Sequence, residues 1–104
     1  MSKSNTVITT GGSGYLGTAV TKQLTEAGFV VEDMQVDITD EAAVTKRAAE
    51  IKEVHKSIWG VVHLASSPLD RKRLLDLTLD EFQKPLAVQA AGTFLVARAL
   101  HPLI

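Results

Sequence analysis

The sequence predicts an α/β fold, a three-layer unit with three to four parallel strands, in one domain over residues 1–104. Two observations support this prediction. Apolar β-type runs at residues 6–9, 29–36 and 58–65 alternate with segments of helix-period hydrophobicity. A glycine-rich loop joins the first run to the first helix, and this context is typical of proteins that bind dinucleotides.

The composition is that of an ordinary globular domain, with 45% apolar and 22% charged residues. The net charge of −1 gives no electrostatic reason to expect nucleic acid or an anionic membrane as a partner. The chain has no cysteine, and its three histidines lack the spacing of a metal site. The N-terminus has no apolar signal core, and no apolar run approaches about 18 residues. We therefore expect a cytoplasmic protein without a bound metal.

The glycine loop, residues 10–17, reads TGGSGYLG. Gly11 permits a tight turn out of the strand, Gly14 lets the backbone approach a pyrophosphate, and Gly17 lets the helix pack against the strand. The N–H groups at the start of the helix then face the phosphates. A purely structural turn is the alternative, but the strand before the loop and the helix after it favour nucleotide binding. Together they predict a Rossmann-like unit.

The segment after the first helix, residues 29–40, is too short to hold two parallel strands and the crossover between them. The helix is expected over residues 15–27, with Gly28 at its end. Two parallel strands need a crossover of about a dozen residues, and the chain between Gly28 and Asp37 has no room for one. We therefore expect one strand over residues 29–36. An irregular edge in part of this segment is the alternative.

A second helix is expected to begin at Thr39 or Asp40, either of which can cap its first turn. Its apolar stripe consists of Val44, Ala48, Ile51 and Val54.

The C-terminal third is expected to be helical. Residues 69–77 are short and charged, which favours a solvated helical turn. Thr78 and Glu81 have the spacing of a capping box, which opens a longer helix. Pro85 should kink or restart that helix, and Pro102 should end it.

The loop TGGSGYLG resembles the cofactor loop of the short-chain dehydrogenase/reductase family, in the spacing of its extended branch. Residues 58–65, IWGVVHLA, resemble the family's fourth strand, which ends beside the nicotinamide ribose. Residues 77–94 resemble the next family helix, in its classical branch. The resemblance runs from about Thr6 to Ile104 and covers only the N-terminal half of the family's domain, so it implies a truncated Rossmann-like unit. It implies a nicotinamide dinucleotide as the ligand.

The acid that contacts the adenosine is expected to be Asp37, which lies 20 residues beyond Gly17, a typical distance for a ribose contact. In that role it would favour NAD over NADP. The family resemblance instead makes Asp37 the residue that contacts the adenine ring. A turn aspartate before a helix is the third interpretation. Glu32 and Asp33 are rival acids that would sit in the middle of a strand.

Small residues after the 58–65 strand let the cofactor ribose approach, although the family's glycine is missing there. His63 is expected to be a strand side chain packed on a helix and not a base. The predicted contacts to the cofactor, NAD or NADP, are Gly11, Ser13, Gly14, Tyr15, Leu16, Gly17, Asp37, Ile38, Ala65 and Ser66.

No catalytic residue is predicted. The family's reaction uses a Tyr with a Lys four residues later, but Tyr15 is the only tyrosine and no lysine follows at that spacing. Gln89 matches the family's Asn, and the remaining matches would lie beyond Ile104. We expect dinucleotide binding without hydride transfer by this chain alone. The alternatives are an interaction module without a ligand, or part of a reductase that needs a C-terminal half.

The last helix, residues 86–100, has no wide polar face. A helix that is apolar all round is buried on all sides. One side can cover the sheet, so we expect the other to pack against a second copy, giving a homodimer.

Overall fold

The computed structural model describes residues 4–67 and 72–104, which form an open sheet of three parallel strands. The strands are β1 (Thr6–Thr10), β2 (Val30–Asp33) and β3 (Gly60–His63), in the order β2-β1-β3. In register, Ile8 of β1 lies opposite Glu32 of β2 and Val61 of β3. This confirms the predicted α/β class, with three strands in the described chain.

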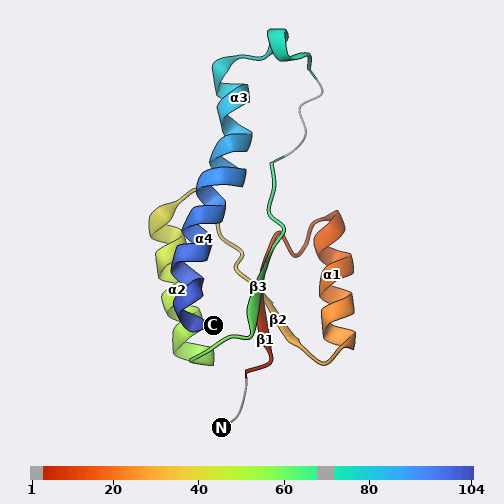
Figure 1. The fold of residues 1–104 in the computed structure, drawn as a ribbon, viewed down its shortest axis with the longest axis vertical. Helices are drawn as coiled ribbons and strands as arrows, with labels where there is room; N and C mark the ends of the chain where they lie inside the picture. Colours follow the sequence, from red (N-terminus) through yellow and green to blue (C-terminus); the bar gives the residue numbers. More distant parts are fainter. Residues whose placement is uncertain (1–3, 68–71) are drawn as a thin grey trace.

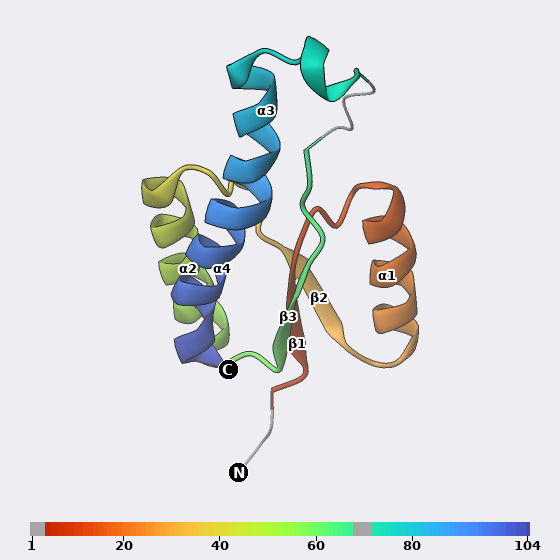
Figure 2. The same cartoon turned by 45° about the horizontal axis from the view of Figure 1, so that its top comes forward.

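Helices cover both faces of the sheet (Figures 1 and 2). α1 (Tyr15–Glu26) lies on one face, and α2 (Glu41–His55) lies with α4 (Gly92–Leu100) on the other. The predicted three layers are therefore present. α3 (Leu79–Leu86) continues into α4 through a π-helical turn, Ala87–Ala91.

The apolar core lies between the sheet and the α2–α4 pair. The central strand β1 is buried along its whole length, as expected for a strand with a neighbour on each side. The buried core residues are Ile8, Met34, Ile38, Val44, Ala48, Ile51, Ile58, Val96, Leu100 and Leu103.

The segment after α1 forms one strand, as predicted, but β2 ends at Asp33 and not at Val36. The Asp33 carboxylate accepts a hydrogen bond from the Gln35 amide at 3.0 Å, and Gln35 has a φ of 53°. This left-handed residue turns the chain out of the sheet. Met34, only 1% exposed, then enters the core on the α2 side.

α2 begins after Asp40, one of the two predicted caps, whose side chain accepts a hydrogen bond from the Ala43 amide at 3.1 Å. The first three residues of the predicted apolar stripe are buried. The fourth, Val54, is 72% exposed, so this prediction was wrong. His55 takes the inward position instead, because it is one residue further round the helix and contacts Glu32 of β2.

The helix that follows begins with the predicted capping box, in which Thr78 and Glu81 exchange side-chain and backbone hydrogen bonds. Part of the turn predicted over residues 69–77 lies outside the described residues, and a 3₁₀ turn, Leu74–Asp76, lies inside them. Pro85 stays within α3, and the π turn follows directly. The helix ends near Pro102 as predicted, in a 3₁₀ turn, His101–Leu103.

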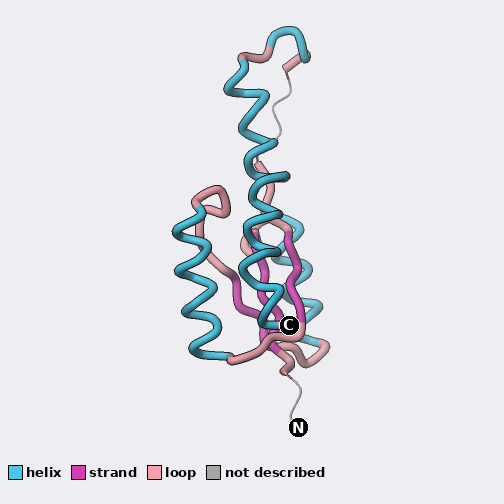
Figure 3. Tube along the Cα trace, turned by 60° about the vertical axis from the view of Figure 1, so that its left-hand side comes forward, coloured by secondary structure: helices cyan, strands magenta, loops and turns pink. Residues whose placement is uncertain are grey.

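α3 projects beyond the sheet as an arm (Figure 3). The chain measures 56 Å along its longest axis, and its radius of gyration is 15.3 Å. A compact domain of this length would have a radius of about 13 Å. Within the described residues, no helix is long and apolar enough to cross a membrane.

Candidate functional site

The glycine loop turns sharply at Gly11, which has a φ of 67°. The Gly14 amide closes the turn by donating a hydrogen bond to the Gly11 carbonyl at 3.1 Å. A Cβ atom on Gly11 would lie 2.8 Å from the backbone nitrogen of Ala65. Only glycine satisfies both the backbone conformation and the close approach of the chain after β3.

Gly17, in the first turn of α1, packs against the same turn. A Cβ atom there would lie 2.0 Å from the Gly11 carbonyl oxygen, and Gly17 is buried. The helix therefore packs on the loop's own backbone, a more local contact than the helix–strand packing that the sequence suggested.

Gly14 is different, because almost nothing fills the space beside it. A Cβ atom on Gly14 would approach only the Gly11 carbonyl oxygen, at 3.3 Å. Gly14 is also the N-cap of α1. All residues of this helix are described, and among them no side chain caps the first N–H groups and no acidic residue lies in the first turn. The start of α1 thus presents unpaired N–H donors and the positive end of its dipole to an open surface.

An open depression of about 520 Å³ adjoins this helix start. Tyr15 is fully exposed beside it, and Leu16 is 61% exposed. The depression is lined by Ser13, Gly14, Tyr15, Leu16, Thr18, Ala19 and Lys22.

Asp33 is the acid that contacts the loop. Its Oδ1 atom accepts hydrogen bonds from the Gly12 amide at 2.7 Å and from the Thr9 hydroxyl at 2.8 Å. Asp33 is the last residue of β2, so the expectation that it would sit in mid-strand was wrong. It lies 16 residues after Gly17, and its place at the end of an apolar run is the signal that could have identified it.

Asp37 is exposed, and its carboxylate accepts hydrogen bonds from the amide (2.9 Å) and hydroxyl (2.6 Å) of Thr39. The hydroxyl and amide of Thr39 lower the pKa of Asp37. This is the geometry of a turn aspartate that precedes a helix. The neighbouring Ile38 is 5% exposed, and its side chain packs in the core.

The chain after β3 is held beside the loop by Thr10. Its Oγ1 atom accepts hydrogen bonds from the amides of Leu64 at 3.1 Å and Ala65 at 3.2 Å. Of the two residues predicted here, Ala65 is therefore brought against Gly11, and Ser66 follows it on the exposed surface.

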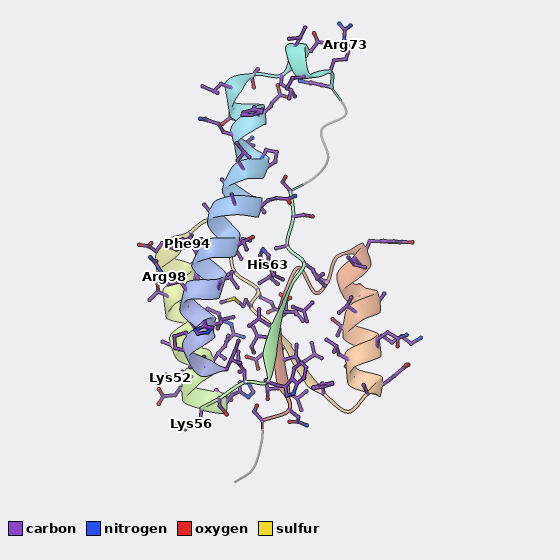
Figure 4. All side chains as sticks on the ribbon, viewed as in Figure 1. Lys52, Lys56, His63, Arg73, Phe94 and Arg98 are labelled. Carbon is purple, nitrogen blue, oxygen red and sulfur yellow. The ribbon has the colours of Figure 1, made fainter. Side chains whose placement is uncertain are left out.

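His63 packs against α4, as predicted, and lies between β3 and that helix (Figure 4). Its two ring nitrogens lie within hydrogen-bond distance of Thr10 and Thr93. Burial lowers the pKa of His63, which favours the neutral imidazole. These two partners could not be predicted from local sequence, because they are 53 and 30 residues away.

Comparisons with known proteins place this geometry in context. The sequence model of a protein family described as enoyl-(acyl carrier protein) reductase matches residues 5–104 of this chain. No curated protein sequence matches the chain.

Similar solved structures include a short-chain dehydrogenase from Leptospira borgpetersenii with bound NAD⁺ (21% identity, TM-score 0.86, covering 97% of this chain and 46% of that one). The sorbitol-6-phosphate 2-dehydrogenase of Erwinia amylovora is 23% identical, with a TM-score of 0.83, and the match covers 93% of this chain and 48% of that one. The ligand-free aldohexose dehydrogenase of Thermoplasma acidophilum is 18% identical, with a TM-score of 0.86 and coverage of 97% and 44%.

The chain spans about half the length of these solved structures. Their fold is shared at low sequence identity, and the family match extends over nearly the whole chain. The chain therefore belongs to the short-chain dehydrogenase/reductase family.

Proposed function

We propose that the chain binds a nicotinamide dinucleotide through the glycine loop, and that it favours NAD over NADP. The observation that carries this proposal is the pairing of an uncapped, open helix start at Gly14 with the carboxylate of Asp33, which reaches the same loop from the end of β2. The family supports a nicotinamide cofactor, and a similar structure contains NAD⁺.

The pyrophosphate lies at the start of α1 in this proposal. The first-turn N–H groups donate to its oxygens, and the helix dipole favours its charge. The absence of a side chain on Gly14 leaves room for that approach. Ser13, Tyr15 and Leu16 form the wall of the depression beside it.

Asp33 takes the adenosine ribose, the role that the sequence suggested for Asp37. Its Oδ2 atom accepts one protein hydrogen bond, from Gln35, and a carboxylate oxygen can accept a second from a ribose hydroxyl. The 2′-phosphate of NADP would instead place negative charge beside this carboxylate. Contact of the nicotinamide ribose with Ala65 and Ser66, and of adenine with Asp37 and the Ile38 backbone, completes the proposed site.

Titration of the protein with NADH and NADPH, followed by calorimetry or by nicotinamide fluorescence, tests the proposal. We expect saturable binding that is tighter for NADH. Gly14→Val should remove it, because the valine side chain would occupy the pyrophosphate's place. Gly60→Val is the matched control: the space beside Gly60 is open, and it lies at the other end of β3. Equal affinity in wild type and Gly14→Val would contradict the proposal.

We further propose that residues 1–104 alone do not transfer hydride. Tyr15 is the only tyrosine; it is fully exposed on the loop and has Ala19 in place of a lysine four residues later. The Tyr–Lys pair that carries the acid–base chemistry of the family is therefore absent from residues 1–104. Steady NADH oxidation that depends on a carbonyl substrate, and that persists in Tyr15→Phe, would overturn this.

The arm and the free side of β3 favour a second role, assembly. On the α3 arm, Leu79, Phe82 and Leu86 are 70%, 48% and 51% exposed, and they share one face at helical spacing. In the described sheet β3 is an edge strand. An apolar helix face and an open strand edge both favour association with another chain. We propose that a second copy covers the helix face, as a homodimer.

Sedimentation at micromolar concentration tests this assembly, with an expected mass of twice 11.2 kDa. Phe82→Glu with Leu86→Glu should give a folded monomer, and Gln83→Glu on the same arm should stay dimeric. A charged residue at Val96, on the following helix, would not test the contact between copies, because Val96 is 2% exposed and packs in the core. A wild-type monomer at high concentration would contradict the homodimer.

A further inference from the structure

His63 connects three secondary-structure elements through the contacts of its two ring nitrogens. Its Nδ1 atom lies 2.7 Å from the Thr10 hydroxyl at the end of β1, and its Nε2 atom lies 3.0 Å from the Thr93 hydroxyl on α4. His63 itself is the last residue of β3. The ring thus bridges the sheet and α4 (Figure 4).

The partners of the two hydroxyl groups fix the direction of each hydrogen bond. The Thr93 hydroxyl donates to the Gln89 carbonyl at 2.6 Å, so it can only accept from His63. The Thr10 oxygen already accepts from two amides, so its hydrogen is directed at Nδ1. His63 is therefore neutral, with its proton on Nε2.

The surroundings of the ring agree with a neutral imidazole. A cavity of about 240 Å³ adjoins the ring. Besides His63, it is lined by Thr93, His101, Val61, Val96, Ala97 and Ile104. No acidic side chain is among the residues that line this cavity. Burial also lowers the pKa of His63, which favours the same neutral form.

The Thr10 bond connects this ring to the glycine loop. Thr10 is 2% exposed, so without Nδ1 its hydroxyl hydrogen would have no nearby water to accept it. The hydroxyl would then turn toward another acceptor and weaken its hold on the Ala65 amide, while the Leu64 amide keeps its hydrogen bond to the Thr10 carbonyl at 3.0 Å. The backbone of Ala65 is the surface against which Gly11 rests.

We propose that His63 is a positioning residue for the dinucleotide site: as the Nε2–H tautomer it fixes Thr10, and Thr10 fixes the chain after β3 against the glycine loop. Its effect on ligand affinity depends on the proposed function, whereas its tautomer and its effect on the Ala65 amide do not. The role needs no contact between His63 and the ligand.

Three variants separate the two bonds of the ring. In His63→Asn the amide oxygen can take the place of Nδ1 and keep the Thr10 bond. In His63→Gln the amide nitrogen can take the place of Nε2 and keep only the Thr93 bond, and His63→Leu keeps neither. We expect His63→Asn to bind NADH within about threefold of wild type, and the other two to bind about tenfold more weakly, the effect of one lost hydrogen bond.

Thr93→Val is the control on the α4 side. It removes the Nε2 partner and the hydroxyl's hydrogen bond to the Gln89 carbonyl within the helix, but it leaves the Thr10 bond, so NADH affinity should stay near that of wild type. Circular dichroism and thermal unfolding establish that each variant is folded before it is titrated. Equal NADH affinity in all of the His63 variants would overturn the positioning role.

Two readouts on the ligand-free protein distinguish failure of this inference from failure of the proposed function. The ¹⁵N chemical shifts of the His63 ring report its tautomer, and we expect Nε2–H at neutral pH. Hydrogen exchange at Ala65 should be faster in His63→Leu than in His63→Asn, whereas Leu64, whose amide also donates to the Thr10 carbonyl at 3.0 Å, should stay protected in both. An Nδ1–H or doubly protonated ring, or unchanged exchange at Ala65, would overturn the inference whether or not NADH binds. If these two results hold and wild type does not bind NADH, the proposed function alone is wrong.

Discussion

The carboxylate of Asp33 accepts a hydrogen bond from the amide of Gly12 at 2.7 Å, across 21 residues of sequence. This bond joins the end of β2 to the glycine loop. The same oxygen accepts from the buried Thr9 hydroxyl of β1, so one side chain ties together the loop and two strands. The shape of the loop therefore depends on a residue outside it.

Replacement of Asp33 separates its structural role from its charge. Asp33→Ala leaves the Gly12 amide and the Thr9 hydroxyl without their acceptor, so we expect the free energy of unfolding to fall by about 1–3 kcal/mol. Asp33→Asn keeps one oxygen for these donors and should fold better, but its preference for NADH over NADPH should shrink. Urea unfolding and paired titrations measure the two effects. Asp37→Asn is the control, and a change of cofactor preference there alone would restore Asp37 as the ribose contact.

The glycines of the loop should differ in what they tolerate. Gly17→Ala places a Cβ atom 2.0 Å from the Gly11 carbonyl oxygen, so the loop or the helix must shift and thermal stability should fall. Gly14→Ala meets that oxygen at 3.3 Å, and its φ of −73° suits any residue, so its stability should stay close to that of wild type. Thermal unfolding by circular dichroism compares the two, and equal losses would contradict the packing described for Gly17.

Replacement of Lys56, which lies directly after α2, by glycine should stabilise the folded protein. It has φ 63° and ψ −45°, and the Ser57 amide donates a hydrogen bond to the His55 carbonyl across it at 2.6 Å. This is a γ-turn with positive φ, which is strained for any residue with a side chain. We expect Lys56→Gly to raise the free energy of unfolding by about 1 kcal/mol, which is about 4–8 °C in Tm for a domain of this size.

Lys52→Gly is the control for Lys56, because Lys52 lies inside the last turn of α2 (Figure 4). There glycine should lower the free energy of unfolding by about 1 kcal/mol. A loss of stability in both variants would mean that the backbone at Lys56 is not strained.

Acid should weaken the link between β2 and α2. The Glu32 carboxylate accepts hydrogen bonds from His55 at 3.1 Å and from Arg47 at 3.0 Å, and the hydrogen bond from His55 is the main cause that lowers its pKa. The folded state thus binds this proton less readily than the unfolded state. Its contribution to stability is present above pH 4.5 and is lost as the pH falls through the lower, folded-state pKa.

Glu32→Gln removes that titrating group, so its stability should fall less steeply below pH 4.5 than that of wild type. Urea unfolding at a series of pH values measures the slope. Glu53→Gln, at an exposed position of α2, should keep the wild-type slope. Identical slopes for wild type and Glu32→Gln would refute the role of this contact.

Local sequence signals predicted much of the fold. The glycine spacing predicted the turn at Gly11 and a tight contact at Gly17, although that contact is with the loop and not with the strand, and the Thr78–Glu81 spacing predicted the capping box. The lack of room for a crossover after Gly28 predicted one strand there. Each of these signals depends on neighbours a few residues apart, which a sequence displays directly.

The errors came from tertiary contacts. The end of β2 depends on Asp33 and its partners in the loop, so the β-type run up to Val36 overestimated the strand. The choice of His55 over Val54 as the inward residue depends on Glu32 of β2. The π turn after Pro85 likewise had no local signal beyond the proline itself.

The most direct test of the account is a titration of the ¹⁵N-labelled protein with NADH, followed by the amide resonances. We expect the largest shifts at Gly12, Gly14 and Asp33 and in the first turn of α1, with smaller shifts at Ala65 and Ser66 and none along α2. Saturating shifts in that set would support the glycine loop as the dinucleotide site. Unchanged spectra at millimolar NADH, or shifts confined to the α2–α4 side of the sheet, would contradict it.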